Sequence, residues 1–242
     1  MIAKGGKSIY GASVGILMLD AQFPRVPGDM GNAQTWSFPV LYRIVRNASP
    51  DLVVRQRAEG LLDAFIDAAR DLVKDGVDGI TTNCGFLSLF QEELAEAVSV
   101  PVATSSLMQV EMVNRVLPAG KHAGVLTISA STLSKEHLRK ARVPEGTPIG
   151  TTEGGIEFTS AILENKLTLD VDKARTDNVK AALALQSDNP DLGAIVLECT
   201  NMCPYAPDIQ KATGLPVFSI VSLINWFHAG LTPPEYLKSP RT

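Results

Sequence analysis

The strongest constraint on the fold of this chain is a repeat within its own sequence. Residues 80–102 align without a gap with residues 195–217, which brings Cys84 into register with Cys199. Each segment also contains an apolar run, a helical stretch and a proline-centred strand in the same order. A cysteine, a helix and a strand that share one register predict two similar halves, each with a cysteine just past a central strand.

Apolar runs of strand length alternate with stretches of helical periodicity along most of the chain. Such alternation is typical of parallel sheets flanked by helices. The predicted strands are 14–20, 40–45, 52–55, 76–83, 100–104, 123–129, 194–198 and 215–219. The predicted helices are 56–75, 87–98, 105–117, 131–141, 171–187 and 206–213. A long loop is expected over 21–38, and no element is predicted within 143–170.

The repeat and the alternation together define the expected architecture. We predict an α/β fold of two similar parallel-sheet halves related by a pseudo-twofold axis, with the active-site cleft between them. The opening segments support this division, because VGIL at 14–17 resembles AGVL at 123–126. The first half is expected to comprise residues 1–107 and 220–242, and the second half residues 108–219.

Composition excludes several classes of function. The 242 residues carry a net charge of −4, with a pI near 5.4, which argues against an extended nucleic-acid surface. No apolar run approaches a membrane span, and the N-terminus lacks a convincing signal-peptide cleavage site, so no membrane association is expected. Three cysteines are few and odd in number. We therefore expect no disulfide framework and a cytoplasmic location.

Sequence motifs for nucleotides and metals are absent. Neither GxxxxGKS nor GxxxxGKT occurs, and no GxGxxG lies between a strand and a helix. The three histidines His122, His137 and His228 are scattered, which does not favour a zinc site. Cys203 follows Cys199 by four residues and is expected to pack, with a redox or metal role as the alternative. We expect no cofactor and no metal.

The positions of Cys84 and Cys199 have a chemical meaning. Ligands of open α/β sheets bind at the carboxyl ends of the strands. A helix that starts there directs its free N–H groups at the same place, which favours a thiolate and can bind a carboxylate. Gly85 permits close approach of the backbone to a ligand. Two thiols on opposite sides of one carbon can remove a proton and return one, as stereoinversion requires.

The motifs TNCGF (82–86) and ECTNM (198–202) resemble those of the aspartate/glutamate/hydantoin racemase superfamily. The resemblance implies a cofactor-independent enzyme of two halves, in which Cys84 and Cys199 are the acid–base pair. It also implies that groups around each cysteine hold a small carboxylate-bearing substrate, and that a homodimer is possible. The residues implied for this role are Asn83, Gly85, Phe86, Thr200 and Asn201, with Thr104 and Ser105 after the next strand.

Departures from the usual racemase motifs leave the reaction open. Amino-acid racemases usually carry Cys-Asn-Thr at the first site and Cys-Thr-His or Cys-Thr-Glu at the second. Here the sites read CGF and CTN. The loop FPRVPGDMGNAQTW (23–36) is more similar to the dimethylsulfoniopropionate (DMSP) lyase branch of the superfamily. The favoured function is a racemase or epimerase. The alternatives are a carbon–sulfur lyase giving acrylate and dimethyl sulfide, a decarboxylase or isomerase, and a two-lobed binding protein without chemistry.

Further polar residues are candidates for the same pocket, each with a structural alternative. Arg25 could bind a carboxylate through two parallel hydrogen bonds, or be a solvated loop residue. Asp20 is a pocket residue or a turn former, and Tyr205 covers the pocket or packs. Glu198 tunes the neighbouring thiol or points away from it.

Overall fold

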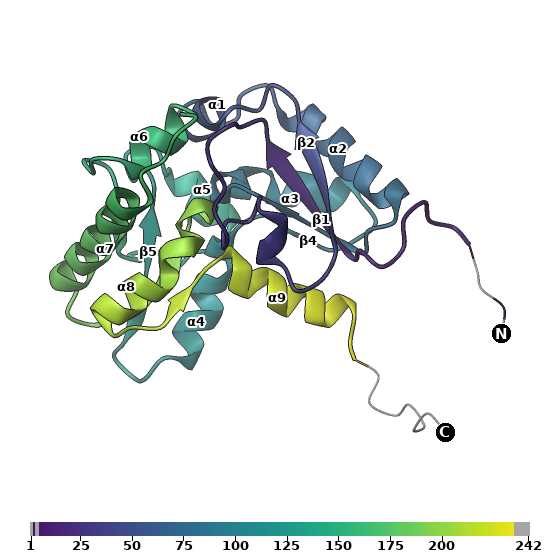
Figure 1. The fold of residues 1–242 in the computed structure, drawn as a ribbon. Coiled ribbons are helices and arrows are strands. Elements are labelled where there is room, and N and C mark those ends of the chain that lie inside the picture. Colours follow the sequence, from purple (N-terminus) through teal and green to yellow (C-terminus); the bar gives the residue numbers. More distant parts are fainter. Residues whose placement is uncertain (1, 3–4, 235–242) are drawn as a thin grey trace, which may run out of the picture.

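The strands form two separate parallel sheets in the computed structural model, which describes residue 2 and residues 5–234 (Figure 1). The first sheet has the order β2-β1-β3-β4, and the second has the order β6-β5-β7-β8. Adding four to each strand number of the first sheet gives the order of the second sheet, so the two sheets have the same topology. The strands are β1 (Val14–Leu19), β2 (Val40–Val45), β3 (Gly79–Thr82), β4 (Val102–Ala103), β5 (His122–Thr127), β6 (Ile149–Thr151), β7 (Leu192–Leu197) and β8 (Val217–Phe218). The predicted α/β fold of two similar halves is confirmed.

Helices flank the two sheets, as parallel sheets require when both faces are buried. All residues of β1 and β3 are buried. The α-helices are α1 (Pro50–Val54), α2 (Leu62–Asp75), α3 (Gln91–Ala97), α4 (Val110–Val116), α5 (Lys135–Lys140), α6 (Phe158–Leu163), α7 (Val171–Asp188), α8 (Ala206–Thr213) and α9 (Ile220–Leu231). The 3₁₀ helices are η1 (Ala33–Thr35), η2 (Gly85–Phe90), η3 (Ser106–Gln109) and η4 (Thr200–Tyr205).

Helix α2 illustrates how sequence pattern becomes packing. Phe65, Ala68 and Leu72 lie at helical spacing and are buried, so one face of the helix joins the core. The helix ends at Gly76, whose φ of 120° would be strained for a residue with a side chain. The expected C-terminal glycine is therefore where the structure needs it.

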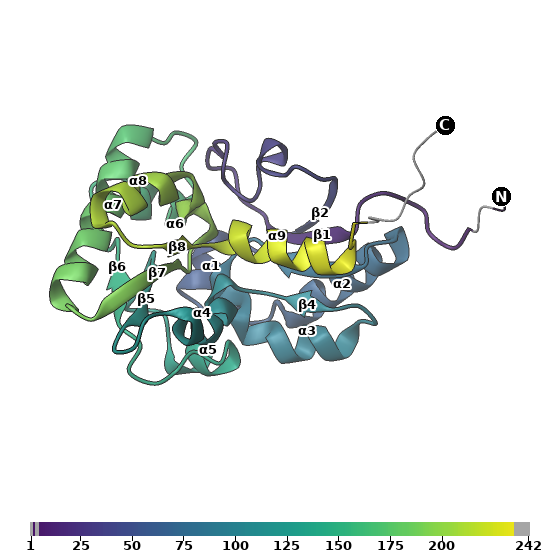
Figure 2. The same ribbon diagram turned by 90° about the horizontal axis from the view of Figure 1, so that it is seen from below.

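Helix α9 returns from the second sheet to cover the first sheet (Figure 2). Its buried residues Ile220, Leu223 and Ile224 belong to one apolar cluster with Val14 and Ile16 of β1. This packing is consistent with placing the C-terminal segment in the first half, although the boundaries of the two halves remain a prediction. Residues 1, 3–4 and 235–242, which were assigned to the first half, lie outside the described residues.

The predicted strand over 52–55 is wrong, because Pro50–Val54 form helix α1. The side chain of Ser49 accepts a hydrogen bond from the backbone N–H of Leu52, and Pro50 occupies the first turn. Both features start helices. The apolar run LVV was long enough for a strand, but the capping signal before it decides the outcome.

Several elements were not predicted or begin differently. The predicted helix 206–213 is confirmed as α8, which the 3₁₀ turn η4 precedes, whereas the first residues of the predicted helix 87–98 belong to the 3₁₀ turn η2. The segment 143–170 contains β6 and α6, which the sequence pattern did not indicate. The buried carboxylate of Asp177 accepts hydrogen bonds from the backbone N–H groups of Ile156, Glu157 and Phe158 and so fixes the start of α6. A cap supplied from a distant helix is invisible in a local pattern.

Within the described residues, no helix combines the length and the apolar character needed to cross a bilayer.

Candidate active site

The two cysteines occupy equivalent places in the two sheets. Cys84 follows β3 and starts η2, while Cys199 follows β7 and starts η4. Both strands are central in their sheets. The two residues are 9% and 7% exposed, respectively, and both thiols are free. The sheets therefore deliver one thiol each to the same region, at the carboxyl ends of parallel strands, where ligands bind.

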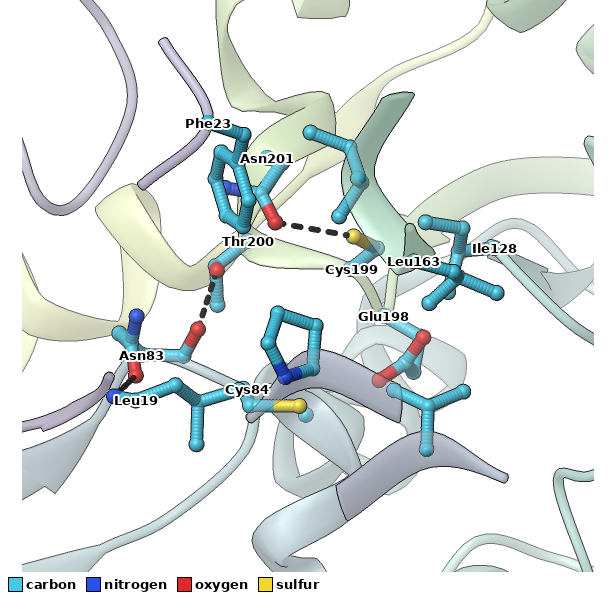
Figure 3. Close-up of a pocket in the computed structure, with 14 residues that line it drawn as sticks. Leu19, Phe23, Asn83, Cys84, Ile128, Leu163, Glu198, Cys199, Thr200 and Asn201 are labelled. Atoms are coloured by element: carbon cyan, nitrogen blue, oxygen red, sulfur yellow. Dashed lines mark hydrogen bonds between the residues drawn. The ribbon is translucent and has the colours of Figure 1, made fainter. Parts of the chain in front are cut away.

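A small cavity lies between these strand ends and is lined from both halves (Figure 3). Its polar lining consists of Asn83, Cys84, Gly85, Glu198, Cys199, Thr200 and Asn201. Its apolar lining consists of Leu19, Phe23, Pro50, Val54, Ile128, Ile162 and Leu163. The volume of about 20 Å³ gives room for roughly one water molecule. A substrate with several carbon atoms needs a wider cavity, so the apolar residues that cover it must move.

The covering loop is tied across the two halves. The side-chain oxygen of Asn165, just beyond α6, accepts hydrogen bonds from the backbone N–H groups of Gln22 and Phe23 at 2.6 and 3.2 Å. Phe23 in turn lines the cavity. These hydrogen bonds hold the loop after β1 against the second half.

The residues that precede the two cysteines have their side chains fixed. The side-chain oxygen of Asn83 accepts the backbone N–H of Leu19 at 2.7 Å. In Glu198, Oε2 accepts the hydroxyl of Thr127 at 2.7 Å, whereas Oε1 is buried without a hydrogen-bond partner among the described residues. Burial raises the pKa of Glu198 to about 7. Glu198 is thus a buried carboxyl group that titrates near neutral pH.

Gly85 is required by the close approach of Glu198. A Cβ atom on Gly85 would lie 2.2 Å from Oε1 of Glu198 and 2.4 Å from the backbone oxygen of the same residue. Neither separation is possible for real atoms. A glycine follows Cys84 because the other half of the molecule packs its carboxyl group against this backbone position.

The closed cavity favours the neutral thiols. Burial, and after it the negative charge of Glu198, raises the pKa of Cys84 to about 12. The backbone N–H groups of Phe86 and Leu87 lower it. Burial and Glu198 likewise raise the pKa of Cys199. The expectation that the helix start favours a thiolate is wrong for this closed state: the N–H groups act in the expected direction, but the loss of solvation is larger.

A polar chain connects the long loop with the second cysteine. Arg25 donates to Asp29 at 2.8 Å, and the amide of Asn201 donates to the other oxygen of Asp29 at 2.5 Å. The thiol of Cys199 donates to the side-chain oxygen of Asn201 at 3.6 Å. The guanidinium also lies 4.6 Å from the ring centre of Phe23. One terminal nitrogen of Arg25 is buried without a partner among the described residues, so it has a donor to spare.

The structure brings some of the candidate residues together and places others apart. Asn83, Gly85, Thr200 and Asn201 line the cavity with the two cysteines. The remaining candidates, which do not line it, are Phe86, Arg25, Thr104, Ser105, Asp20 and Tyr205.

The candidates outside the cavity have structural contacts of their own. Phe86 packs edge-on against His137, and Tyr205 packs edge-on against Phe158. Thr104 is hydrogen-bonded to Gln91. Ser105 caps η3. Asp20 pairs with Arg46 at the surface.

Sequence reasoning missed most of the apolar cover. Ile162 and Leu163 lie in the segment for which no element was predicted. Val54 lies within the predicted strand 52–55 and Pro50 just before it, and both belong to helix α1. The signal that could have located α1 is the Ser-Pro-Asp start at residues 49–51.

Comparison with known proteins gives relatives by sequence. No family model matches the chain. A "Dimethylsulfoniopropionate lyase" of Durusdinium sp. clade D is 28% identical over 230 residues, which cover 92% of this chain and 76% of the relative. "Dimethylsulfoniopropionate lyase 7" of Emiliania huxleyi (strain CCMP1516) is 29% identical over 232 residues, covering 90% and 67%, respectively.

Comparison with solved structures gives the fold. Arylmalonate decarboxylase matches with a TM-score of 0.61 at 17% identity, covering 94% of this chain and 95% of the other. A glutamate racemase of Bacillus anthracis matches with a TM-score of 0.57 at 16% identity, covering 91% and 83%, respectively. These two structures show the fold of the chain, and they are named as a decarboxylase and a racemase. The resemblance carried by the two cysteine motifs is therefore confirmed: the chain shares the two-half fold of arylmalonate decarboxylase and glutamate racemase, and its curated relatives are named as DMSP lyases.

Proposed function

We propose that the chain is a cofactor-independent enzyme that removes a proton from a carbon next to a carboxylate, with a cysteine thiolate as the base. The observation that carries this proposal is the cavity lined by Cys84 and Cys199, one from each half. An acid–base group at a buried site contributes to catalysis when it reaches the proton that it transfers. Two such groups in one cavity with polar and apolar walls suit a small organic acid.

Elimination from a DMSP-like substrate is the reaction that we propose first. The alignments with the two named DMSP lyases cover 92% and 90% of this chain, which supports this assignment. The thiolate would take the proton from the α-carbon, and the electron pair would form the carbon–carbon double bond. The bond from the β-carbon to sulfur would break, and dimethyl sulfide would leave as a neutral molecule with acrylate. One base is sufficient.

Racemisation or epimerisation is the second candidate, because each half supplies a thiol to the same cavity. In that reaction one thiolate removes the proton and the opposite thiol returns another. Both cysteines are then essential, whereas elimination requires one of them.

The substrate carboxylate has donors available around the cavity. The amides of Asn83 and Asn201 lie in the lining. The hydroxyl of Thr200 lies there too, but it donates to the backbone oxygen of Asn83 and would have to turn to reach a substrate. Arg25 has a buried nitrogen without a partner, beside the loop that covers the cavity. We propose that widening of the cavity lets these groups hold the carboxylate, with Arg25 providing the compensating positive charge.

Proton NMR in D2O tests these assignments with DMSP, both enantiomers of aspartate and glutamate, a hydantoin and an arylmalonate. Acrylate and dimethyl sulfide support the lyase, and α-deuteration with loss of optical activity supports the racemase. Cys84→Ser and Cys199→Ser should lower kcat by about a hundredfold or more where the residue acts as acid or base. Cys203→Ser is the matched control, because Cys203 is buried but does not line the cavity. No product and no exchange with any of these substrates would contradict the proposal.

A further inference from the structure

Glu198 is a buried carboxyl group at the junction of the two halves. The residue is 1% exposed and lines the cavity together with both thiols. Figure 3 shows its carboxyl group beside the same cavity that Cys84 and Cys199 border. The negative charge of Glu198 acts on the thiols of both cysteines. It is the one side chain of the cavity lining, among the described residues, that is a carboxylic acid.

The two oxygens of this carboxyl group are treated differently. Oε2 accepts the hydroxyl of Thr127, and the backbone N–H of Ile128 also donates to the carboxylate. Oε1 has no hydrogen-bond partner among the described residues. A buried, unpartnered carboxylate oxygen costs more free energy than a protonated carboxyl group at the same place. The site therefore holds the group firmly while allowing it to gain or lose a proton.

The neighbouring backbone is shaped for this carboxyl group. Oε1 lies where a side chain on Gly85 would begin, directly beside Cys84. A residue with a Cβ atom at position 85 would exclude the carboxyl group from this place. The glycine at position 85 thus leaves the space in which Oε1 of Glu198 lies, next to the residue that follows Cys84.

We propose that Glu198 accepts the proton that a cavity thiol must lose to become the base, and releases that proton when the cycle is complete. This inference rests on the proposed function, because it assigns the proton partner of the thiols in the same site. In this role a carboxyl group, rather than solvent, takes up the thiol proton inside a closed cavity, so the total charge of the cavity does not change.

The proton step balances without a further reagent. The S–H bond of the thiol breaks and, through one water molecule for which the cavity has room, an O–H bond forms on Glu198, so one negative charge moves from the carboxylate to sulfur. The thiolate then forms a new S–H bond with the proton taken from the substrate carbon. After the product leaves and the cavity opens, the carboxyl proton passes to solvent, and the enzyme returns to its starting state.

The groups that act on this proton are few. Cys84 and Cys199 are the titratable groups that line the cavity with Glu198, and Arg25 acts on Cys84 from the covering loop. Thr127 and Ile128 contribute uncharged donors. With the carboxyl protonated, each thiol loses a negative neighbour, and its ionisation becomes easier.

Glu198→Gln separates this role from a structural one, because it keeps the size and the acceptor oxygen but removes the titratable group. The first measurement is the rate of alkylation of each cysteine by iodoacetamide between pH 5 and pH 10, read by mass spectrometry. Loss of the negative charge lowers the thiol pKa, so Glu198→Gln should be alkylated about tenfold faster near pH 8. Glu59→Gln removes an exposed carboxyl group and should leave the rates unchanged.

The second measurement is kcat against pH with the active substrate of the NMR panel. Glu198→Gln should lower kcat by about a hundredfold while KM changes little, and Glu198→Asp should restore part of the rate. The alkylation rate of Cys203, which is buried outside the cavity, should stay unchanged in Glu198→Gln, because loosened packing would speed the alkylation of all three buried thiols. Unchanged kcat, or unchanged alkylation of both cysteines, would overturn the role of Glu198.

A third measurement needs neither a folded variant nor an active substrate. Infrared difference spectra of the unmodified protein between pH 5 and pH 9 should contain the band of one buried protonated carboxyl group that disappears as pH rises. If the substrate panel is inactive, the proposed function fails, while the alkylation rates and this band still decide whether Glu198 exchanges a proton near the thiols. Absence of the band would overturn the inference without reference to turnover.

Discussion

The two halves share one backbone arrangement around their cysteines and differ in the residue that precedes each cysteine. Asn83 and Glu198 are equivalent in the repeat, and their backbone N–H groups donate to Leu17 and Leu126, respectively, at 2.9 and 2.8 Å. The first half thus presents a neutral amide and the second a carboxyl group at the same place. The two halves thus share the backbone at this position and differ in its charge.

The residues after the cysteines extend this contrast. Phe86 of the first half packs on His137 of the second, at 5.0 Å between ring centres. Its counterpart Asn201 donates to Asp29 of the first half. The same position therefore makes an apolar contact across the halves on one side and a polar contact on the other. The two thiols therefore have different surroundings.

The largest expected effect concerns the apolar side of this comparison. Burial, and then the charge of Arg57, lowers the pKa of His137 to about 4. Unfolded histidine titrates near its usual value, so the unfolded state binds the extra proton first as pH falls. The stability that neutral His137 contributes is complete above about pH 6.5 and is lost down to about pH 4, by about 2 to 3 kcal/mol.

Urea unfolding at several pH values measures this effect by comparing His137→Gln with the unmodified protein. Glutamine at this helix position can still accept the backbone N–H of Ser134. The difference in unfolding free energy between the two proteins should shrink as pH falls from 6.5 to 4. Glu198 acts in the opposite direction in both proteins, because its raised pKa favours the folded state as pH falls through 7. A constant difference contradicts the prediction.

Gly85→Ala should have the next largest effect, since it forces the first half to resemble the second, where Thr200 is the equivalent residue. The new methyl group would collide with the carboxyl and backbone oxygens of Glu198. Overpacking of this kind costs about 2 kcal/mol. Thermal unfolding should show the loss. Gly230→Ala serves as the control, because no atom lies within 4 Å of the added carbon; equal melting temperatures for the two variants would sink the argument.

Asn83→Asp removes the charge difference between the halves by adding a second carboxyl group. The new side chain can still accept the backbone N–H of Leu19. The added negative charge should raise the pKa of Cys84 and slow its alkylation near pH 8 by about tenfold. Asn114→Asp is the matched control, because Asn114 also accepts a backbone N–H, that of Ala123, away from the cavity. An equal change in both variants would show that the charge acts only at long range.

The smallest effect should come from the hydroxyl groups that join the halves. Thr200 donates to the backbone oxygen of Asn83 at 2.6 Å, and Ser106 donates to that of Leu197 at 2.5 Å. Thr200→Val and Ser106→Ala should each lower the free energy of unfolding by about 1 kcal/mol, since each leaves a buried carbonyl without this donor. Chemical denaturation measures both. A much larger loss for one variant would show that the two hydrogen bonds do not contribute equally to the stability of the contact between the halves.

The overall arrangement of strands and helices could be predicted from the sequence. The repeat predicted two similar halves and the positions of Cys84 and Cys199 past central strands, because strand position depends on local apolar runs and their order. The same local patterns failed at residues 52–55, where the cap before Pro50 outweighs an apolar run. They also failed at α6, whose start depends on the distant carboxylate of Asp177.

The chemistry of the site depends on contacts between the halves, which no local pattern contains. Gly85 suggested a close approach by a ligand, but the group that approaches is Glu198 from the other half. The sequence placed Glu198 beside Cys199, yet nothing in it showed that this side chain also lies against the turn after Cys84. Burial of both thiols, which reverses the expected shift in their pKa, is likewise a property of the assembled molecule.

The contact between Gly85 and Glu198 also limits the order in which such a chain can evolve. A side chain at position 85 and a carboxyl group at position 198 exclude each other, so the effect of either mutation depends on the residue at the other position. A carboxyl group can be acquired at 198 after glycine is in place at 85, whereas the reverse order passes through an intermediate with colliding atoms. The two positions lie 113 residues apart in the sequence. A shorter residue at 198 removes only the clash with the carboxyl group and leaves the clash with the backbone oxygen, so a laboratory selection that starts from Gly85→Ala should mainly recover glycine at position 85.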